Sequence, residues 1–152
     1  SRLSRGLGDV YKRQINSNEL IILDSKGICL PVEYCDLSLP ILSNFKSNPE
    51  LYPKGSKTVS TNVLSSISII KYTKDNFSMI YDNISEFVFN EESEYEIILK
   101  NGKTRILLGS QKLEEKMKYL NSFQEALKEE KFLTDFKYID LRYSNQVIVK
   151  ET

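Results

Sequence analysis

Residues 94–108, EYEIILKNGKTRILL, decide the fold class more clearly than any other stretch of the chain. Tyr95, Ile97 and Leu99 recur at every second position, which is the spacing of a strand with one buried face. Asn101-Gly102 then predicts a type I′ turn. An outgoing strand follows at Thr104, Ile106 and Leu108, so the stretch predicts a β-hairpin.

The segments on either side of this hairpin predict a sheet with a helix against it. Residues 84–89 predict a neighbouring strand. A helix is expected from residue 109 to about residue 130, with an apolar stripe at Leu113, Met117, Leu120 and Leu127. A coiled coil is the rival interpretation, but an apolar stripe of only about three turns is more typical of one helix packed on a sheet. Residues 136–143 and 146–150 predict two strands joined at Ser144-Asn145.

The first half of the chain predicts a second group of elements. Residues 20–24 and 28–30 predict two strands joined by the turn residues Asp24-Ser25-Lys26-Gly27. Four prolines then predict an extended segment in which Leu39-Pro40-Ile41-Leu42 packs on the core. A helix is expected over residues 57–72, and Asp75 is expected to cap a short helical turn carrying Phe77 and Ile80. The inward side of the longer helix is expected to carry Val59, Val63, Ile67 and Ile70.

This order of elements predicts an α+β fold, with a mixed or antiparallel β-sheet and two main helices packed on one face. The 152 residues suit one domain with a single core. The longest apolar runs, such as residues 20–23, are far shorter than the roughly 20 residues of a membrane span.

Residues 1–14, SRLSRGLGDVYKRQ, differ from the rest of the chain. They carry four basic residues against one acidic residue, with no apolar stretch of the signal-peptide kind. The string also resembles a translated sequencing adapter, and a basic arm that binds nucleic acid or lipid is the alternative. We therefore expect residues 1–18 to be non-native or disordered and residues 19–152 to form the domain.

Composition argues against several functions. The chain has 21 basic and 21 acidic residues, so no overall positive field attracts nucleic acid. It has no histidine, which removes the commonest general base and zinc ligand. The cluster at Glu91, Glu92 and Glu94 is expected to be a solvated loop, and Asp140 with Arg142 an exposed structural ion pair. Cys29 and Cys35 permit a small disulfide loop, although two free thiols are the commoner state. No catalytic residue, cofactor or metal is expected.

Several motifs, taken in order, resemble a known family. Residues 138–150, YIDLRYSNQVIVK, resemble the closing strands of the β domains of the bacterial cell-division family FtsQ/DivIB, and the ending is similar to its Bacteroidetes branch. The stretches 22–27 and 39–42 are similar to the family's entry into the domain. The Asn101-Gly102 hairpin, which leads into Leu108-Gly109 and an amphipathic helix, has the family's order.

The resemblance implies a scaffold function at the periplasmic face of the inner membrane. It implies a longer protein with a single membrane span and a POTRA domain ahead of this β domain. The last strand would lie at a sheet edge and pair with a strand of an FtsB/FtsL-like division protein, which links it to septal peptidoglycan synthesis. No small-molecule substrate is implied. By position, the contacts would come from Tyr143, Asn145, Gln146, Val147, Ile148, Val149, Lys150 and Ser110. The family can carry an arginine at the position of Ser110, and this chain has none there.

A terminal edge strand is physically suited to such pairing, because its unpaired N–H and C=O groups are a template for another strand. The opposite interpretation is that residues 146–150 lie inside the sheet and only fill the core. Two other functions stay open: a secreted or periplasmic ligand-binding module or enzyme, and a POTRA-type outer-membrane assembly protein. The Asp-Leu-Arg-Tyr sequence at residues 140–143 argues against the last of these.

Overall fold

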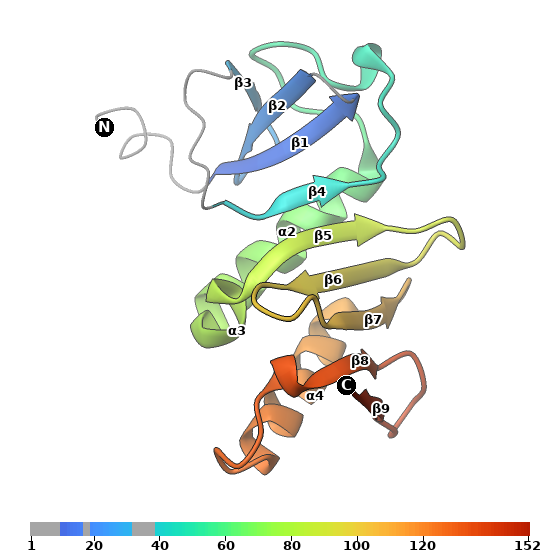
Figure 1. Cartoon of the computed structure of the whole chain (residues 1–152). Helices are drawn as coiled ribbons and strands as arrows, with labels where there is room; N and C mark the ends of the chain where they lie inside the picture. The colour runs from blue at the N-terminus through green and yellow to red at the C-terminus, as the bar shows by residue number, and fades with distance from the viewer. Residues whose placement is uncertain (1–9, 17–18, 32–38) are drawn as a thin grey trace. The chain divides into compact units, whose positions relative to one another are not determined.

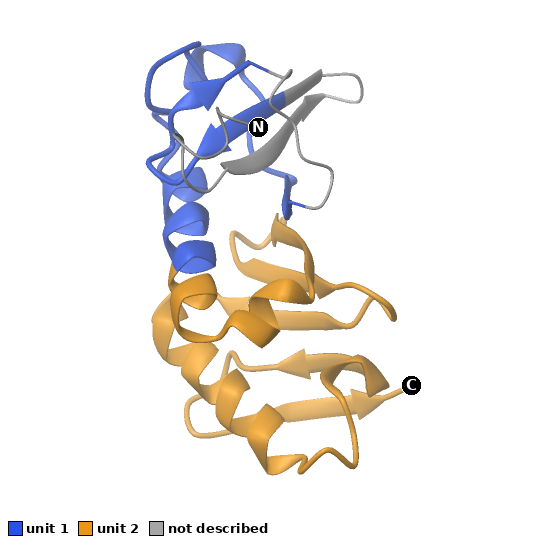
Figure 2. Cartoon of the chain, turned by 90° about the vertical axis from the view of Figure 1, so that its left-hand side faces the viewer, with its two compact units in different colours: residues 1–71 blue, residues 72–152 orange. Residues whose placement is uncertain are grey.

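The computed structural model describes residues 10–16, 19–31 and 39–152 and has the predicted α+β fold (Figure 1). The chain divides into two compact units, residues 1–71 and residues 72–152 (Figure 2). Among the described residues, none of the helices combines the length and the apolarity needed to cross a membrane.

Unit 1 contains four short strands in the order β3-β2-β1-β4. They are β1 (Val10–Asn16), β2 (Glu19–Asp24), β3 (Cys29–Leu30) and β4 (Ile41–Ser43), followed by a short 3-10 helix at Pro49–Leu51. β2 pairs antiparallel with β1 and β3, whereas β1 and β4 are parallel. The turn between β2 and β3 forms as predicted, because the side chain of Asp24 accepts hydrogen bonds from the backbone N–H groups of Lys26 and Ile28.

β1 includes residues 10–14 of the adapter-like segment. Its antiparallel pairing with β2 runs from Val10 to Asn16. The domain boundary at residue 19 stays a prediction.

Helix α2 (Thr61–Asn76) begins later than predicted. Val63, Ile67 and Ile70 are buried as expected, but the prediction for Val59 is wrong, since its side chain is 61% exposed. The reason is the backbone before the helix, where Val59 donates its N–H to Leu51 O and Thr58 donates to Gly27 O. These bonds hold residues 58 and 59 in a loop and place Val59 outside the helical stripe.

The prediction that Asp75 caps a second helical turn is also wrong, because Asp75 lies inside α2. Helix α3 (Ser78–Asp82) begins after Phe77, whose N–H bonds back to Thr73 O. Ile80 is buried as predicted.

Unit 2 is a five-strand sheet in the order β5-β6-β7-β8-β9. The strands are β5 (Ile84–Phe89), β6 (Tyr95–Leu99), β7 (Arg105–Gly109), β8 (Phe136–Asp140) and β9 (Ile148–Glu151). All neighbours pair antiparallel except β7 and β8, which are parallel and joined through helix α4 (Leu113–Ala126). The sheet is therefore mixed, as predicted.

The central hairpin forms, but its turn is not type I′. Asn101 and Lys103 have φ of 55° and 58°, and Gly102 has a φ of 148°, far from the value of about 90° expected at the second central position of that turn. A Cβ at Gly102 would lie 3.2 Å from Thr134 O. The loop thus packs closely on the 3-10 helix at Leu133–Asp135, a tertiary contact that the local sequence does not reveal.

Helix α4 packs on the sheet through Met117 and Leu120, which are fully buried, and through the ring of Phe123, 5.5 Å from that of Phe136. It runs along one side of the strands of unit 2 (Figure 2). It ends at Ala126, earlier than predicted, because Lys128 and Glu129 take left-handed φ values of 52° and 63°.

The last two strands are shorter than predicted. β8 ends at Asp140 and not at residue 143, and β9 begins at Ile148 and not at residue 146. At the end of β8 the side chain of Asp140 accepts a hydrogen bond from the backbone N–H of Arg142.

Cys29 has a buried free thiol, and its predicted alternative partner Cys35 lies outside the described residues. Burial, and then the negative charge of Asp24, raise the pKa of this thiol to about 11. A group with a raised pKa keeps its proton to higher pH in the folded protein, so the reactive thiolate is scarce.

We therefore expect Cys29 to resist alkylation in the folded protein. At pH 9 a thiol with a pKa of about 11 has roughly fiftyfold less thiolate than an ordinary one, and burial blocks the reagent further. Peptide-level mass spectrometry after iodoacetamide treatment would measure this, with the denatured protein as the control. Equal labelling rates in the two samples would contradict the buried assignment.

Candidate functional site

The strand β9 lies at one end of the strand order and pairs with β8 along its inner side. No other strand in the described part of the chain pairs with its outer side. β9 therefore occupies an edge, and the interpretation in which it fills the interior of the sheet is wrong.

The side chains along this edge are exposed on both faces. Val147, Ile148 and Val149 are 36%, 41% and 37% exposed, and Lys150 and Glu151 are exposed as well. Because strand side chains alternate, Val147 and Val149 lie on one face and Ile148 on the other. Apolar surface is thus presented to both sides of the open edge.

The direction of the β9 peptide groups follows from the pairing of β8. Leu141 donates its N–H to Leu107 O of β7, and alternate residues of a pleated strand direct their peptide groups to opposite neighbours. Tyr138 and Asp140 must then face β9, where they pair with Lys150 and Ile148. It follows that the N–H and C=O of Val149 point away from β8, toward the open edge.

The edge of unit 1 formed by β3 is different, because residues 54–58 cover it. Cys29 donates its N–H to Ser56 O and accepts from the N–H of Gly55, and Thr58 donates to Gly27 O. The peptide groups of β3 are therefore already used within the chain.

The far end of β9 is tied to the loop before β8. Lys131 and Glu151 form an ion pair, and the hydroxyl and N–H of Thr152 both donate to Asp135 O. The open stretch of the edge is therefore its beginning, near Val147.

A tight turn leads into β9. Gln146 donates its N–H to Tyr143 O at 3.4 Å, and Asn145 has a φ of 61°, which places a residue tolerant of left-handed backbone at the third position of the turn. The Arg142 guanidinium lies 5.8 Å from the centre of the Tyr143 ring. The turn predicted at Ser144-Asn145 is present.

A hollow of about 540 Å³ lies beside this turn. Three of the predicted contact residues line it together, Ser110, Tyr143 and Asn145, whereas Gln146 and residues 147–150 do not. The remaining lining consists of residues that the sequence did not single out as a binding site, Glu94, Gly109, Gln111, Lys112, Glu115, Lys116, Tyr119, Arg142 and Ser144. Gly109, Arg142 and Ser144 belong to motifs that the sequence showed for other reasons. The sequence signals of the others were the acidic cluster near residue 94 and the start of an amphipathic helix.

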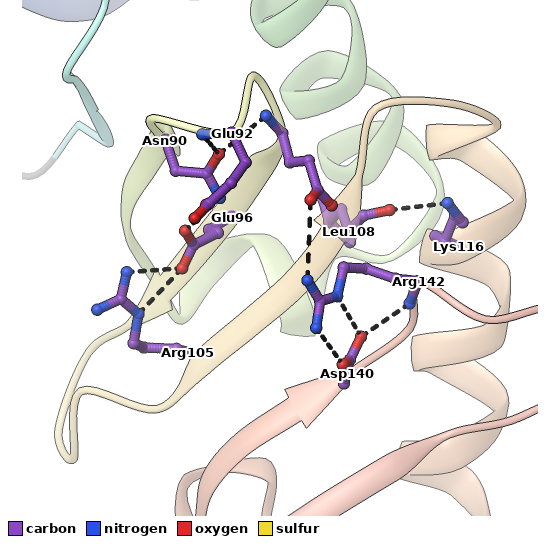
Figure 3. A network of polar contacts seen from close by, with 9 residues as sticks. Asn90, Glu92, Glu96, Arg105, Leu108, Lys116, Asp140 and Arg142 are labelled. Carbon is purple, nitrogen blue, oxygen red and sulfur yellow. Dashed lines mark hydrogen bonds and ion pairs between the residues drawn. The ribbon is translucent and has the colours of Figure 1, made fainter.

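Four charged side chains lie close together next to the hollow: Glu94, Lys116, Asp140 and Arg142. Figure 3 shows the last three of them. Both oxygens of Asp140 accept from the Arg142 guanidinium, at 2.9 Å and 2.8 Å, and Oδ1 also accepts from the Arg142 N–H at 3.0 Å. Arg142 lies 3.8 Å from Glu94, and Lys116 donates to the carbonyls of Leu108 and Gln111.

The predicted ion pair between Asp140 and Arg142 is therefore present, but the prediction that it is exposed is wrong for Asp140, which is only 5% exposed. Burial alone would raise the pKa of Asp140, but the hydrogen bonds and charge of Arg142 outweigh it and lower that pKa. The same hydrogen bonds raise the pKa of Arg142. Burial lowers the pKa of Lys116, against the pull of Glu115 and Glu94.

A second charge pair lies farther along the sheet (Figure 3). Glu96 is also buried, and its Oε1 accepts two hydrogen bonds from Arg105, at 3.0 Å and 2.7 Å, while Oε2 accepts from Asn90. Neither Glu96 nor Arg105 lines the hollow. Within the described residues, no cluster of three or more His, Cys, Asp or Glu side chains could hold a metal ion.

Comparison with known proteins gives one family. The family model described as FtsQ/DivIB, C-terminal related, matches residues 12–150, which is most of the chain. No curated protein matches the chain.

Gly109 leaves the space in which the side chains of Glu94, Lys116 and Arg142 approach one another. Its φ is 79°, and an added Cβ would lie 3.3 Å from Lys116 Nζ and 3.5 Å from Arg142 Cγ. We expect Gly109→Ala to lower the free energy of unfolding by about 1–2 kcal/mol from backbone strain alone, plus the cost of displacing Lys116. Denaturant unfolding followed by circular dichroism would measure this.

Gly55→Ala is the matched control, because Gly55 has a φ of 74° with nothing within 4 Å of the added Cβ. It should show the strain without the crowding. A loss at Gly109 no larger than that at Gly55 would mean that the space around Gly109 is unimportant.

Proposed function

Because the chain belongs to the FtsQ/DivIB C-terminal related family, we propose that it is a scaffold domain of the divisome that binds partner proteins by adding their strand to β9. Family membership supports a role in cell division, and this family is of scaffold type and not a known enzyme family. The proposed partners are FtsB/FtsL-like proteins. The proposed place of action is the periplasmic face of the inner membrane.

The open edge at Val149 is the observation that supports this proposal. Its peptide N–H and C=O are directed away from β8, and an incoming strand offers them the partners that a sheet neighbour would. Val147, Ile148 and Val149 supply apolar side chains on both faces, so an added strand could be packed from either side.

Backbone pairing alone would be too weak for a stable complex. β9 has four residues, and only alternate residues face outward, so an added strand gains about four hydrogen bonds worth roughly 1 kcal/mol each. Micromolar binding requires about 8 kcal/mol after the costs of association. The rest must come from side chains, and the hollow lined by Ser110, Tyr143 and Asn145 adjoins the turn that opens into β9.

The ligand-binding alternative would use the same hollow. Its acidic groups are already engaged, since Glu94 lies beside Arg142 and Glu115 accepts a hydrogen bond from the Tyr119 hydroxyl. Such engaged carboxylates are poor candidates for acid–base catalysis, which needs a group free to take up a proton. The open edge of β9 therefore supports the proposed function better than the hollow supports ligand binding.

Replacing Val149 by proline tests the edge directly. Proline removes the outward N–H and is tolerated on an edge strand when that N–H does not pair within the sheet. We expect the affinity for a purified FtsB/FtsL-like ectodomain to fall at least tenfold, measured by isothermal titration calorimetry, while the thermal melt changes little.

Val149→Thr is the matched control, because it keeps the N–H and the β-branched shape and should bind nearly as well as the natural protein. Full-strength binding by a folded Val149→Pro protein would rule out strand addition at this edge.

A further inference from the structure

We propose that Asp140 is a positioning residue for the binding edge: acting through Arg142, its buried carboxylate fixes the turn at residues 143–146 and the point where β9 begins. Asp140 itself makes no contact with a partner in this proposal. The inference rests on the proposed function, since it concerns how the same edge is held ready.

Asp140 acts first on the backbone, because its Oδ1 accepts a hydrogen bond from the N–H of Arg142. Residues 138 and 140 direct their peptide groups toward β9, so in a continuing strand the N–H of Arg142 would also face β9. The Asp140 side chain accepts that N–H at 3.0 Å instead. Such local side-chain bonds compete with strand pairing, and the ladder accordingly stops at the pair Asp140 and Ile148.

Asp140 also holds the side chain of Arg142. Asp140 holds it at two points, and Glu94, just before β6, lies 3.8 Å from its other end. Figure 3 shows the Arg142 side chain lying against Asp140 at the end of β8. From there it lies over the Tyr143 ring, so the side chain that closes the strand also orients the first residue of the turn.

Asp140 is the cleaner residue to change, because Arg142 lines the hollow and Asp140 does not. A substitution at Arg142 would remove a surface that a partner could touch. A substitution at Asp140 reaches the edge only through Arg142 and the turn.

The pair formed by Glu96 and Arg105 provides a matched control within the same sheet. Glu96 is a carboxylate of equal exposure, 5%, and it also bonds an arginine twice. Its arginine lies on β7, and neither residue belongs to the turn or to β9. A general loss of stability should therefore follow from either Asp140→Ala or Glu96→Ala, whereas a loss of positioning should follow from Asp140→Ala alone. Alanine is chosen because the Oδ1 of an asparagine would still accept the N–H of Arg142.

The experiment compares both variants with the natural protein by amide hydrogen exchange and by titration with an FtsB/FtsL-like ectodomain. We expect Asp140→Ala to speed exchange at the Ile148 and Lys150 amides at least tenfold more than Glu96→Ala does, and to weaken binding at least fivefold. If Asp140→Ala does not fold, Asp140→Asn, which keeps the acceptor for the Arg142 N–H and weakens the two-point contact with the guanidinium, should speed exchange at these amides more than Glu96→Gln does.

Equal exchange at these amides in the two variants would overturn the positioning role. Faster exchange with unchanged binding would overturn it as well, since the position of the edge would then not matter to the partner. If the natural protein does not bind the ectodomain, the proposed function fails, and the exchange comparison still decides whether Asp140 fixes the start of β9.

Discussion

The buried carboxylate of Asp140 is the constraint on which the turn at residues 143–146 and the edge strand β9 depend. A carboxylate removed from water is costly unless charge and hydrogen bonds compensate it, and Arg142 supplies both from two residues away. This pairing lies where β8 ends and the turn at residues 143–146 begins, and in β9 beyond the turn the peptide groups of Val149 are directed outward. An electrostatic requirement of the interior thus determines the shape of the surface.

The sheet of unit 2 gives Asp140 its surroundings. The parallel pairing of β7 and β8 brings the ends of these two strands together, and α4 provides the connection that parallel strands require. Gly109, at the end of β7, leaves the space in which Lys116 and Arg142 approach. The hollow beside the turn is therefore a consequence of the crossover and of a residue without a side chain. Its proposed use by a partner would combine a short ladder of hydrogen bonds with side-chain contacts.

The sequence predicted the elements whose patterns are local. β5 has the predicted bounds, the hairpin of β6 and β7 forms around Asn101-Gly102, and the stripe of α4 packs inward at Met117 and Leu120. The errors occur where distant residues intervene. Val59 is held outside α2 by a bond to Leu51, and the turn at Gly102 is reshaped by contact with Thr134. The site was predicted only in part, because its charged lining comes from three segments separated along the chain.

The sequence by itself determined the α+β class, the order of β2, β3 and β5 to β9 along the chain, the absence of histidine and the family. Alternation, turn residues and motif order are properties of neighbouring positions. Only the tertiary structure decided that Asp140 is buried, that β9 lies at an edge and that Ser110 meets Tyr143 and Asn145 around one hollow. Burial and strand order depend on which segments pack together. The sequence Asp-Leu-Arg-Tyr is identical whether its carboxylate faces water or the core, so the motif alone could not predict the burial of Asp140.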